Sequence, residues 1–209
     1  MPDTTTTPSA PAPRARVEPD AHSPSLFAHF VLQTANYEAV RDWYLTVLNA
    51  QVVYDRHDLC FLTYDDEHHR LAIRHVPGLR PPRPGSWGLH HLAYAYPTLR
   101  ALLSTYLRLK NQGIRPYWTI NHGPTLSFYY RDPDGTQIEL QVDNFRTKEE
   151  AAAFFHGDDF AVNPVGIKLD PEALIRAYEA GVPEAELARR PRMAPGQTLD
   201  DMRPGETPA

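Results

Sequence analysis

Cysteine, long apolar runs and clustered basic residues are all scarce in this sequence. The single cysteine, Cys60, excludes an internal disulfide framework and a multi-cysteine zinc site. No apolar run approaches the roughly 18 residues of a membrane helix, and the N-terminus lacks the apolar core of a signal peptide. The 21 basic and 26 acidic side chains give a net charge of −5 without a Lys/Arg-rich stripe, which argues against nucleic-acid binding. We therefore expect a cytoplasmic enzyme or binding protein with neither a membrane nor a nucleic-acid partner.

Proline and histidine are plentiful, with 21 and 10 residues among 209. Residues 1–24 consist largely of Thr, Pro, Ala and Asp. Such a segment cannot bury enough apolar area to offset its ordering entropy, so we predict a disordered N-terminal tail. The similar composition of residues 194–209 predicts a flexible C-terminal tail. The length suits one folded domain between these tails, and the histidines concentrate at a few places within it.

The folded part begins with two units that share one predicted order of elements, a strand, a helix and three strands. Each unit opens with a short apolar strand, at 26–32 and at 89–94, followed by apolar residues at helical spacing. His29 and His91 mark corresponding positions about 62 residues apart. A repeat of this kind predicts an α+β fold, in which two paired βαβββ modules form a curved open barrel around a cavity. We place the modules at about 26–76 and 89–142 within a domain spanning 25–145. The other predicted strands are 51–54, 59–63, 69–75, 114–118, 126–130 and 137–142.

Residues 146–193 form a helical extension by their composition. Short helices are predicted at 147–156 and 171–180, with a further helical turn at 184–190. Asp170 followed by Pro171 is a favourable cap and first-turn pair for the second of these helices. The extension could pack on the domain, cover the cavity or mediate assembly into a homo-oligomer, and the sequence leaves these alternatives open.

Three polar residues in the predicted strands could hold a metal ion. His29 and His91 lie in the first strand of each unit, and Glu139 lies in the last strand of the second. Ile138 and Leu140 flank Glu139, so strand alternation points its carboxylate to the opposite face, where an unpaired charge is costly. Two imidazoles and one carboxylate on adjoining strands form a ligand set that leaves positions on Fe(II) open for substrate and O2. The alternative is that each residue is a polar side chain facing solvent.

The residues around these positions resemble the vicinal oxygen chelate (glyoxalase/bleomycin resistance/dioxygenase) superfamily over roughly residues 26–145. The motifs are His29-Phe-Val-Leu-Gln-Thr, Trp43-Tyr44, Gly88-Leu-His-His-Leu-Ala-Tyr and Ser127-Phe-Tyr-Tyr-Arg-Asp-Pro-Asp-Gly-Thr-Gln-Ile-Glu-Leu. Within that superfamily the chain looks most like a single-domain type I extradiol catechol dioxygenase. The resemblance implies a metal site in the barrel, with Fe(II), or Mn(II) in its place, bound by His29, His91 and Glu139.

The same resemblance implies three further active-site residues. A double histidine after Phe61 matches a segment in which the second histidine is an acid/base group, here His69. Asn121-His122-Gly123 matches a segment with a second active-site histidine, and Tyr129 matches an active-site tyrosine. A catechol-type diol and O2 would then be the substrates. His69 or Tyr129 would accept a phenolic proton, and His122 or His69 would donate one during ring opening. A surface histidine remains the alternative for both His69 and His122.

Two other functions within the superfamily remain as alternatives. Glyoxalase-type isomerases place four protein ligands on the metal, one on the last strand of each module. Aligning residues 70–73 with 137–140 sets Ala72 opposite Glu139, so the fourth position lacks a ligand. This favours an oxygenase over an isomerase. The second alternative is a metal-free small-molecule binding protein of the resistance type, against which the complete set of His29, His91 and Glu139 argues.

Overall fold

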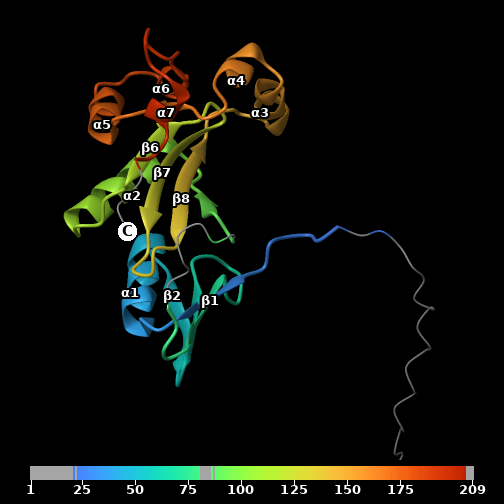
Figure 1. Cartoon of the computed structure of the whole chain (residues 1–209), viewed down its shortest axis with the longest axis vertical. Coiled ribbons are helices and arrows are strands. Elements are labelled where there is room, and N and C mark those ends of the chain that lie inside the picture. Colours follow the sequence, from blue (N-terminus) through green and yellow to red (C-terminus); the bar gives the residue numbers. More distant parts are fainter. Residues whose placement is uncertain (1–20, 22, 81–85, 87, 206–209) are drawn as a thin grey trace, which may run out of the picture.

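The computed structural model describes residues 21, 23–80, 86 and 88–205 (Figure 1). The predicted disordered tail at 1–24 therefore lies outside the described residues, except for Ala21, Ser23 and Pro24. Two sheets organise the chain, and the sheet of the first module lies beneath that of the second in the view of Figure 1.

The first module is a four-stranded sheet in the order β1-β4-β3-β2, with β1 parallel to β4 and the other neighbours antiparallel. One helix covers it and buries Val40, Tyr44 and Val47, which recur at helical spacing. Asn49 ends this helix in the left-handed conformation, as an αL cap. The elements are β1 (Phe30–Thr34), α1 (Tyr37–Leu48), β2 (Gln51–Arg56), β3 (Leu59–Thr63) and β4 (Leu71–His75).

The second module repeats this topology in a five-stranded sheet of order β5-β8-β7-β6-β9. The Thr98 hydroxyl caps its helix by accepting from the Ala101 backbone N–H at 3.1 Å. The predicted α+β fold of two open βαβββ modules is thus confirmed, with β9 added by the C-terminal extension. The elements are β5 (Leu92–Ala95), α2 (Leu99–Asn111), β6 (Trp118–Asn121), β7 (Thr125–Arg131), β8 (Gln137–Asp143) and β9 (Ile167–Lys168).

Four of the predicted strands begin later in the structure, those at 26–32, 69–75, 89–94 and 114–118. The strand predicted at 114–118 begins instead at Trp118, because Pro116 has no N–H to donate to a ladder; pairing with β7 starts where the Tyr117 N–H donates to the Tyr129 carbonyl. His29 and His91 were expected within strands and lie directly before β1 and β5. In each module the parallel ladder begins at the residue after the histidine, so each histidine lies immediately before its pair of parallel strands.

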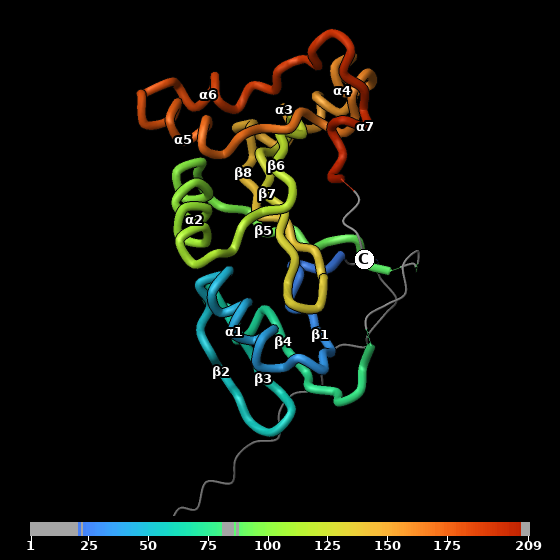
Figure 2. Tube along the Cα trace, turned by 60° about the vertical axis from the view of Figure 1, so that its left-hand side comes forward, coloured from blue at the N-terminus to red at the C-terminus, as the bar shows by residue number. Residues whose placement is uncertain are grey.

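The two modules touch along their helices and along β1 and β5. The Arg108 guanidinium of α2 donates to the carbonyls of Thr46 and Val47 at 2.5 and 3.1 Å, which satisfies the C-terminal end of α1. The rings of Phe30 in β1 and Tyr94 in β5 lie 6.5 Å apart between centroids. Figure 2 shows the two modules stacked, with the extension at the far end of the second.

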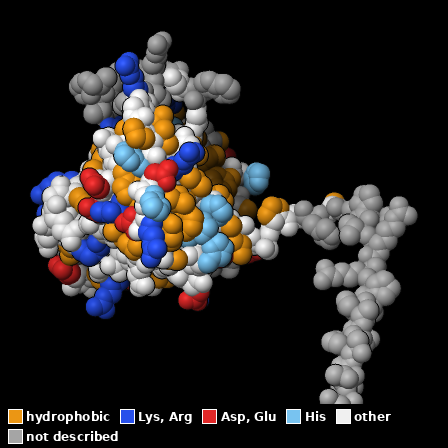
Figure 3. Space-filling model, turned by 90° about the horizontal axis from the view of Figure 1, so that it is seen from below, with side chains coloured by type: hydrophobic (Ala, Val, Ile, Leu, Met, Phe, Trp, Pro, Cys, Tyr) orange, Lys and Arg blue, Asp and Glu red, His pale blue; other side chains and the backbone are white. Residues whose placement is uncertain are grey.

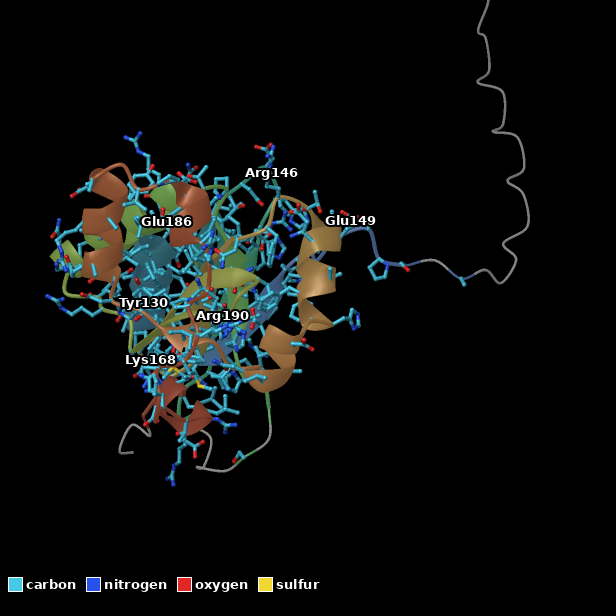
Figure 4. All side chains as sticks on the ribbon, turned by 90° about the horizontal axis from the view of Figure 1, so that it is seen from above. Tyr130, Arg146, Glu149, Lys168, Glu186 and Arg190 are labelled. Atoms are coloured by element: carbon cyan, nitrogen blue, oxygen red, sulfur yellow. The ribbon has the colours of Figure 1, made fainter. Side chains whose placement is uncertain are left out.

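The extension packs on the second module, the first of the three roles that the sequence left open. Its helices gather at the end of the second sheet that faces away from the first module (Figure 1). Arg190 lies between α5 and α6 on one side and α3 and α4 on the other (Figure 4), and donates to the carbonyls of His122 and Asn163 at 3.1 and 2.7 Å. The helices are α3 (Lys148–Phe155), α4 (Asp158–Val162), α5 (Pro171–Glu179), α6 (Glu184–Leu187) and α7 (Leu199–Met202).

The segment predicted as a flexible C-terminal tail contains α7 over its described residues, 194–205. Thr198 and Asp201 cap one another at the start of this helix, and Met202 is only 3% exposed. Composition did not predict this short helix, because a single buried methionine, Met202, holds it against the domain. In the part of the chain that the structure describes, no helix has the length and apolar character needed to cross a membrane.

Candidate metal and substrate site

The second sheet joins His91 to Glu139. Glu139 lies in β8 opposite Ala93 of β5, and His91 stands two residues before Ala93. His91 Nε2 is 3.1 Å from Glu139 Oε2. Glu139 is 5% exposed, while the flanking Ile138 and Leu140 are fully buried in the core on the other face. The carboxylate of Glu139 thus points to the face opposite Ile138 and Leu140, as strand alternation predicts.

The first sheet repeats this register without the carboxylate. Val31 of β1 pairs with Ala72 of β4, as Ala93 pairs with Glu139 in the second sheet. His29 stands two residues before Val31, so it occupies the position that His91 has in the second module. Ala72 is thus the counterpart of Glu139, as the alignment of the two units predicts.

Tyr129 stands beside Glu139 on the neighbouring strand β7, in direct cross-strand register. Burial, the negative charge of Glu139 and a hydrogen bond to that carboxylate all raise the pKa of Tyr129 well above its ordinary value. The His91 ring meets the Tyr129 ring edge to face, with centroids 5.4 Å apart. Tyr129 therefore stays protonated near neutral pH and acts as a hydrogen-bond donor.

His122 extends this row of side chains. Its Nδ1 lies 2.5 Å from the Val165 carbonyl, and because a carbonyl only accepts, Nδ1 carries a hydrogen. Its Nε2 lies 3.0 Å from the Tyr129 hydroxyl. A neutral His122 accepts from Tyr129, whereas a protonated ring donates to the Tyr129 oxygen and leaves the hydroxyl hydrogen for Glu139. His122, Tyr129 and Glu139 can thus pass a proton along one line.

Burial lowers the pKa of His122, and the hydrogen bond to the Val165 carbonyl and the charge of Glu139 oppose that shift only in part. His122 directly follows β6, and Gly166 allows the backbone at Val165 to come close enough to bind the His122 ring. A Cβ on Gly166 would lie 2.5 Å from the Asn121 carbonyl oxygen, and Gly166 has a φ of 121°. The extension therefore supplies the partner that orients His122.

A cavity of about 480 Å³ opens onto this row. Its wall is largely aromatic, since the rings of Trp118 and Tyr129 lie 4.6 Å apart between centroids at a tilt of 30°. His91 and His122 also line it, and the far C-terminal segment contributes Arg203 and Pro204. An aromatic wall beside imidazole and phenol groups can bind a flat ring and exchange protons with its polar substituents.

The remaining predicted residues gather in the first sheet. The His29 and His69 rings lie 4.3 Å apart between centroids, and His69 stacks on Phe61 at 4.6 Å. His68 Nδ1 approaches His69 Nδ1 to 2.6 Å. Burial, together with the neighbouring His29 and His68, lowers the pKa of His69. Figure 3 views the molecule from below and shows histidine side chains among hydrophobic side chains at this end of the molecule.

The predicted site residues thus form two groups, one in each module. His29 lies with His69, while His91 and Glu139 lie with Tyr129 and His122. Over residues 21, 23–80, 86 and 88–205, no group of three or more His, Cys, Asp or Glu side chains stands close enough to hold a metal ion.

Sequence reasoning missed Trp118, Val165 and Arg203 as parts of the site. Trp118 is the last residue of the strand predicted at 114–118, and nothing in the local sequence indicates that its side chain faces a cavity. The pattern from Thr198 to Asp201, a capping box, was the one signal that the chain near Arg203 is ordered.

Comparisons with known proteins agree with this fold. The family model for the Glyoxalase/Bleomycin resistance protein/Dioxygenase superfamily matches residues 26–140. "Biphenyl-2,3-diol 1,2-dioxygenase 2" of Rhodococcus globerulus is 52% identical over 158 residues, which are 75% of this chain and 83% of that protein. "Biphenyl-2,3-diol 1,2-dioxygenase 3" of the same organism is 48% identical over 165 residues, 78% of this chain and 87% of that protein.

Solved structures give a weaker likeness. A glyoxylase/bleomycin resistance protein/dioxygenase domain from Frankia sp. EAN1pec has a TM-score of 0.48 at 20% identity, covering 58% of this chain and 99% of that chain. Lactoylglutathione lyase from Agrobacterium tumefaciens has a TM-score of 0.45 at 19% identity, covering 57% and 94%. The assignment therefore rests on the sequence matches, and by these the chain belongs to the glyoxalase, bleomycin resistance protein and dioxygenase superfamily.

Proposed function

We propose that this protein is an extradiol ring-cleaving dioxygenase, which opens an aromatic vicinal diol beside its two hydroxyls and incorporates both atoms of O2. Two relatives at 52% and 48% identity are named biphenyl-2,3-diol 1,2-dioxygenases, which supports a diol of the biphenyl-2,3-diol class as substrate. The observation that carries the proposal is the row His91, Glu139, Tyr129 and His122, opening onto an aromatic cavity.

The proposed cofactor is Fe(II), with Mn(II) suited to the same ligands, bound by His29, His91 and Glu139. Two imidazoles and one carboxylate fit this ion, and the buried Glu139 already contacts an imidazole. A bound ion would supply coordination positions for the diol oxygens and O2. Because the described residues hold no assembled three-ligand group, the proposal requires His29 to approach the pair when the ion binds.

The side chains of the cavity then bind the ring and handle protons. Trp118 and Tyr129 present aromatic faces to the substrate ring. The raised pKa of Tyr129 favours a hydrogen-bond donor there. The proposed base is therefore His69, which lies beside His29 in the first module and would reach the diol only when His29 approaches the pair. His122 can hold a proton at Nε2 and deliver it through the Tyr129 hydroxyl as the ring opens.

Ala72 separates this proposal from isomerase chemistry. Its position in β4 corresponds to that of Glu139 in β8, and its methyl group cannot bind a metal. With three protein ligands, more coordination positions remain for two substrates. The domain bounds at 25–145, the cytoplasmic location and assembly into a homo-oligomer stay predictions.

An oxygen-electrode assay tests the function. The protein is loaded with Fe(II) under anaerobic conditions and mixed with biphenyl-2,3-diol and then with air-saturated buffer. We expect O2 uptake matched mole for mole by a coloured ring-opened product. His91→Ala should abolish uptake, whereas His156→Ala, a change at an exposed histidine of the extension, should retain most of it. Turnover of the diol without O2 uptake would overturn the proposal.

A further inference from the structure

The C-terminal helix α7 is fastened to the strand that bears the cavity wall. The Trp118 indole N–H in β6 donates to the Met202 carbonyl at 2.9 Å. The Met202 side chain is 3% exposed, so it is packed into the domain. The capping box between Thr198 and Asp201 fixes the start of the helix. These three contacts hold a segment of only a few residues in one place.

This attachment places the next two residues at the cavity. Arg203 and Pro204 line it together with His91, His122 and Tyr129. The Arg203 side chain is 63% exposed, and its guanidinium lies 3.7 Å from the Asp200 carboxylate, which is itself exposed. Such a surface ion pair holds a side chain only weakly, so the guanidinium can turn toward a ligand.

We propose that Arg203 and Pro204, held in place by α7, form the wall that recognises the substituent on the substrate ring, and that Arg203 determines specificity within it. The inference rests on the proposed function. If the two hydroxyls of the diol bind near His91 and Glu139, the substituent on the diol ring would extend through the cavity toward Arg203 and Pro204. A planar guanidinium and a proline ring suit an aryl substituent, because both stack on aromatic faces.

Two pairs of variants test the wall. Met202→Ala loosens the buried anchor, and its control is Ile175→Ala, a comparable truncation in α5 at a residue that is 8% exposed and does not line the cavity. Arg203→Ala removes the guanidinium, and its control is Arg192→Ala, whose 91% exposed side chain has a similar ion pair with Asp159 at 3.8 Å. Arg203 and Arg192 are both surface residues, so the comparison of their two variants stays informative if Met202→Ala fails to fold.

The measurement is KM and kcat for biphenyl-2,3-diol and for unsubstituted catechol. We expect Met202→Ala and Arg203→Ala to raise KM for biphenyl-2,3-diol about twofold to fivefold, the range of an exposed cation–π contact, with little change for catechol. Both controls should leave the ratio of the two KM values as in the wild type. An equal effect on both diols, or none, would overturn the inference.

Calorimetric titration of biphenyl-2,3-diol separates the failure of this inference from the failure of the proposed function. If the wild type binds the diol but never consumes O2, the proposed function fails and the wall is still tested. Weaker binding in Arg203→Ala than in Arg192→Ala would support the wall. Equal Kd values in those two variants would reject it.

Discussion

The carboxylate of Glu139 is buried in β8, and His91 and Tyr129 are among its polar neighbours. Burying a carboxylate costs several kcal/mol unless it is paired. The corresponding position in the first module is Ala72, which shows that this sheet forms without a charge there. The carboxylate therefore serves the site rather than the fold.

Replacing Glu139 tests that conclusion through metal content. Glu139→Ala should lose most of the Fe(II) that the wild type binds at about one ion per chain, because two imidazoles alone make a weak Fe(II) site. Metal analysis after anaerobic loading and gel filtration measures this. The matched control is Glu150→Ala, a change in α3 outside the site. Full occupancy in Glu139→Ala would show that the ion, if bound, has other ligands.

The buried ring of His122 should make stability depend on pH. Its folded pKa is lowered, so folding favours the neutral ring, and this contribution is fully present above the unfolded pKa of about 6.5. Stability is lost as pH falls below that value toward the folded pKa. Urea unfolding of the metal-free protein between pH 7.5 and 5.5 should show the loss, and it should be smaller in His122→Gln. His156→Gln, at an exposed histidine, should follow the wild type.

The local sequence pattern predicted helix α1 but not the start of β6 or the short strand β9. The stripe of Val40, Tyr44 and Val47 predicted α1 because helical period and burial coincide. The start of β6 was misplaced because Pro116 affects the ladder partner and not the apolar pattern. β9 has only two residues, and it pairs with β6 solely because the extension returns to that edge. Its formation depends on contacts distant in sequence, which a local pattern does not contain.

Gly166 tests how the extension supports the site. Gly166→Ala should lower ring-cleaving turnover, because the new Cβ would meet the Asn121 carbonyl at 2.5 Å and push Val165 away from His122. Gly181→Ala is the control, since its φ is also positive, at 82°, but its Cβ would meet nothing within 4 Å. Both variants carry the backbone strain of about 1 kcal/mol, measured by urea unfolding. Equal turnover in the two would show that Val165 does not position His122.

At the scale of the whole molecule, the sequence predicted the two modules but not the distance between the groups they carry. Repeat spacing gives equivalent positions, such as His29 and His91, because each module folds by the same local rules. How closely the modules bring these residues together depends on contacts between them, including Arg108 with the end of α1 and Phe30 with Tyr94. Those contacts join residues far apart in sequence, and no motif encodes their geometry.

Metal binding should therefore draw the modules together. If His29 joins His91 and Glu139 on one ion, loading with Mn(II) should slow amide hydrogen exchange in β1 and β5 at the same time. It should also stabilise the protein by about 2.7 kcal/mol at a metal concentration 100-fold above Kd. His29→Ala should keep exchange in β1 at its metal-free rate. His75→Ala, at the other end of the β1–β4 pair, should respond like the wild type. Protection confined to β5 and β8 would mean that the first module contributes no ligand.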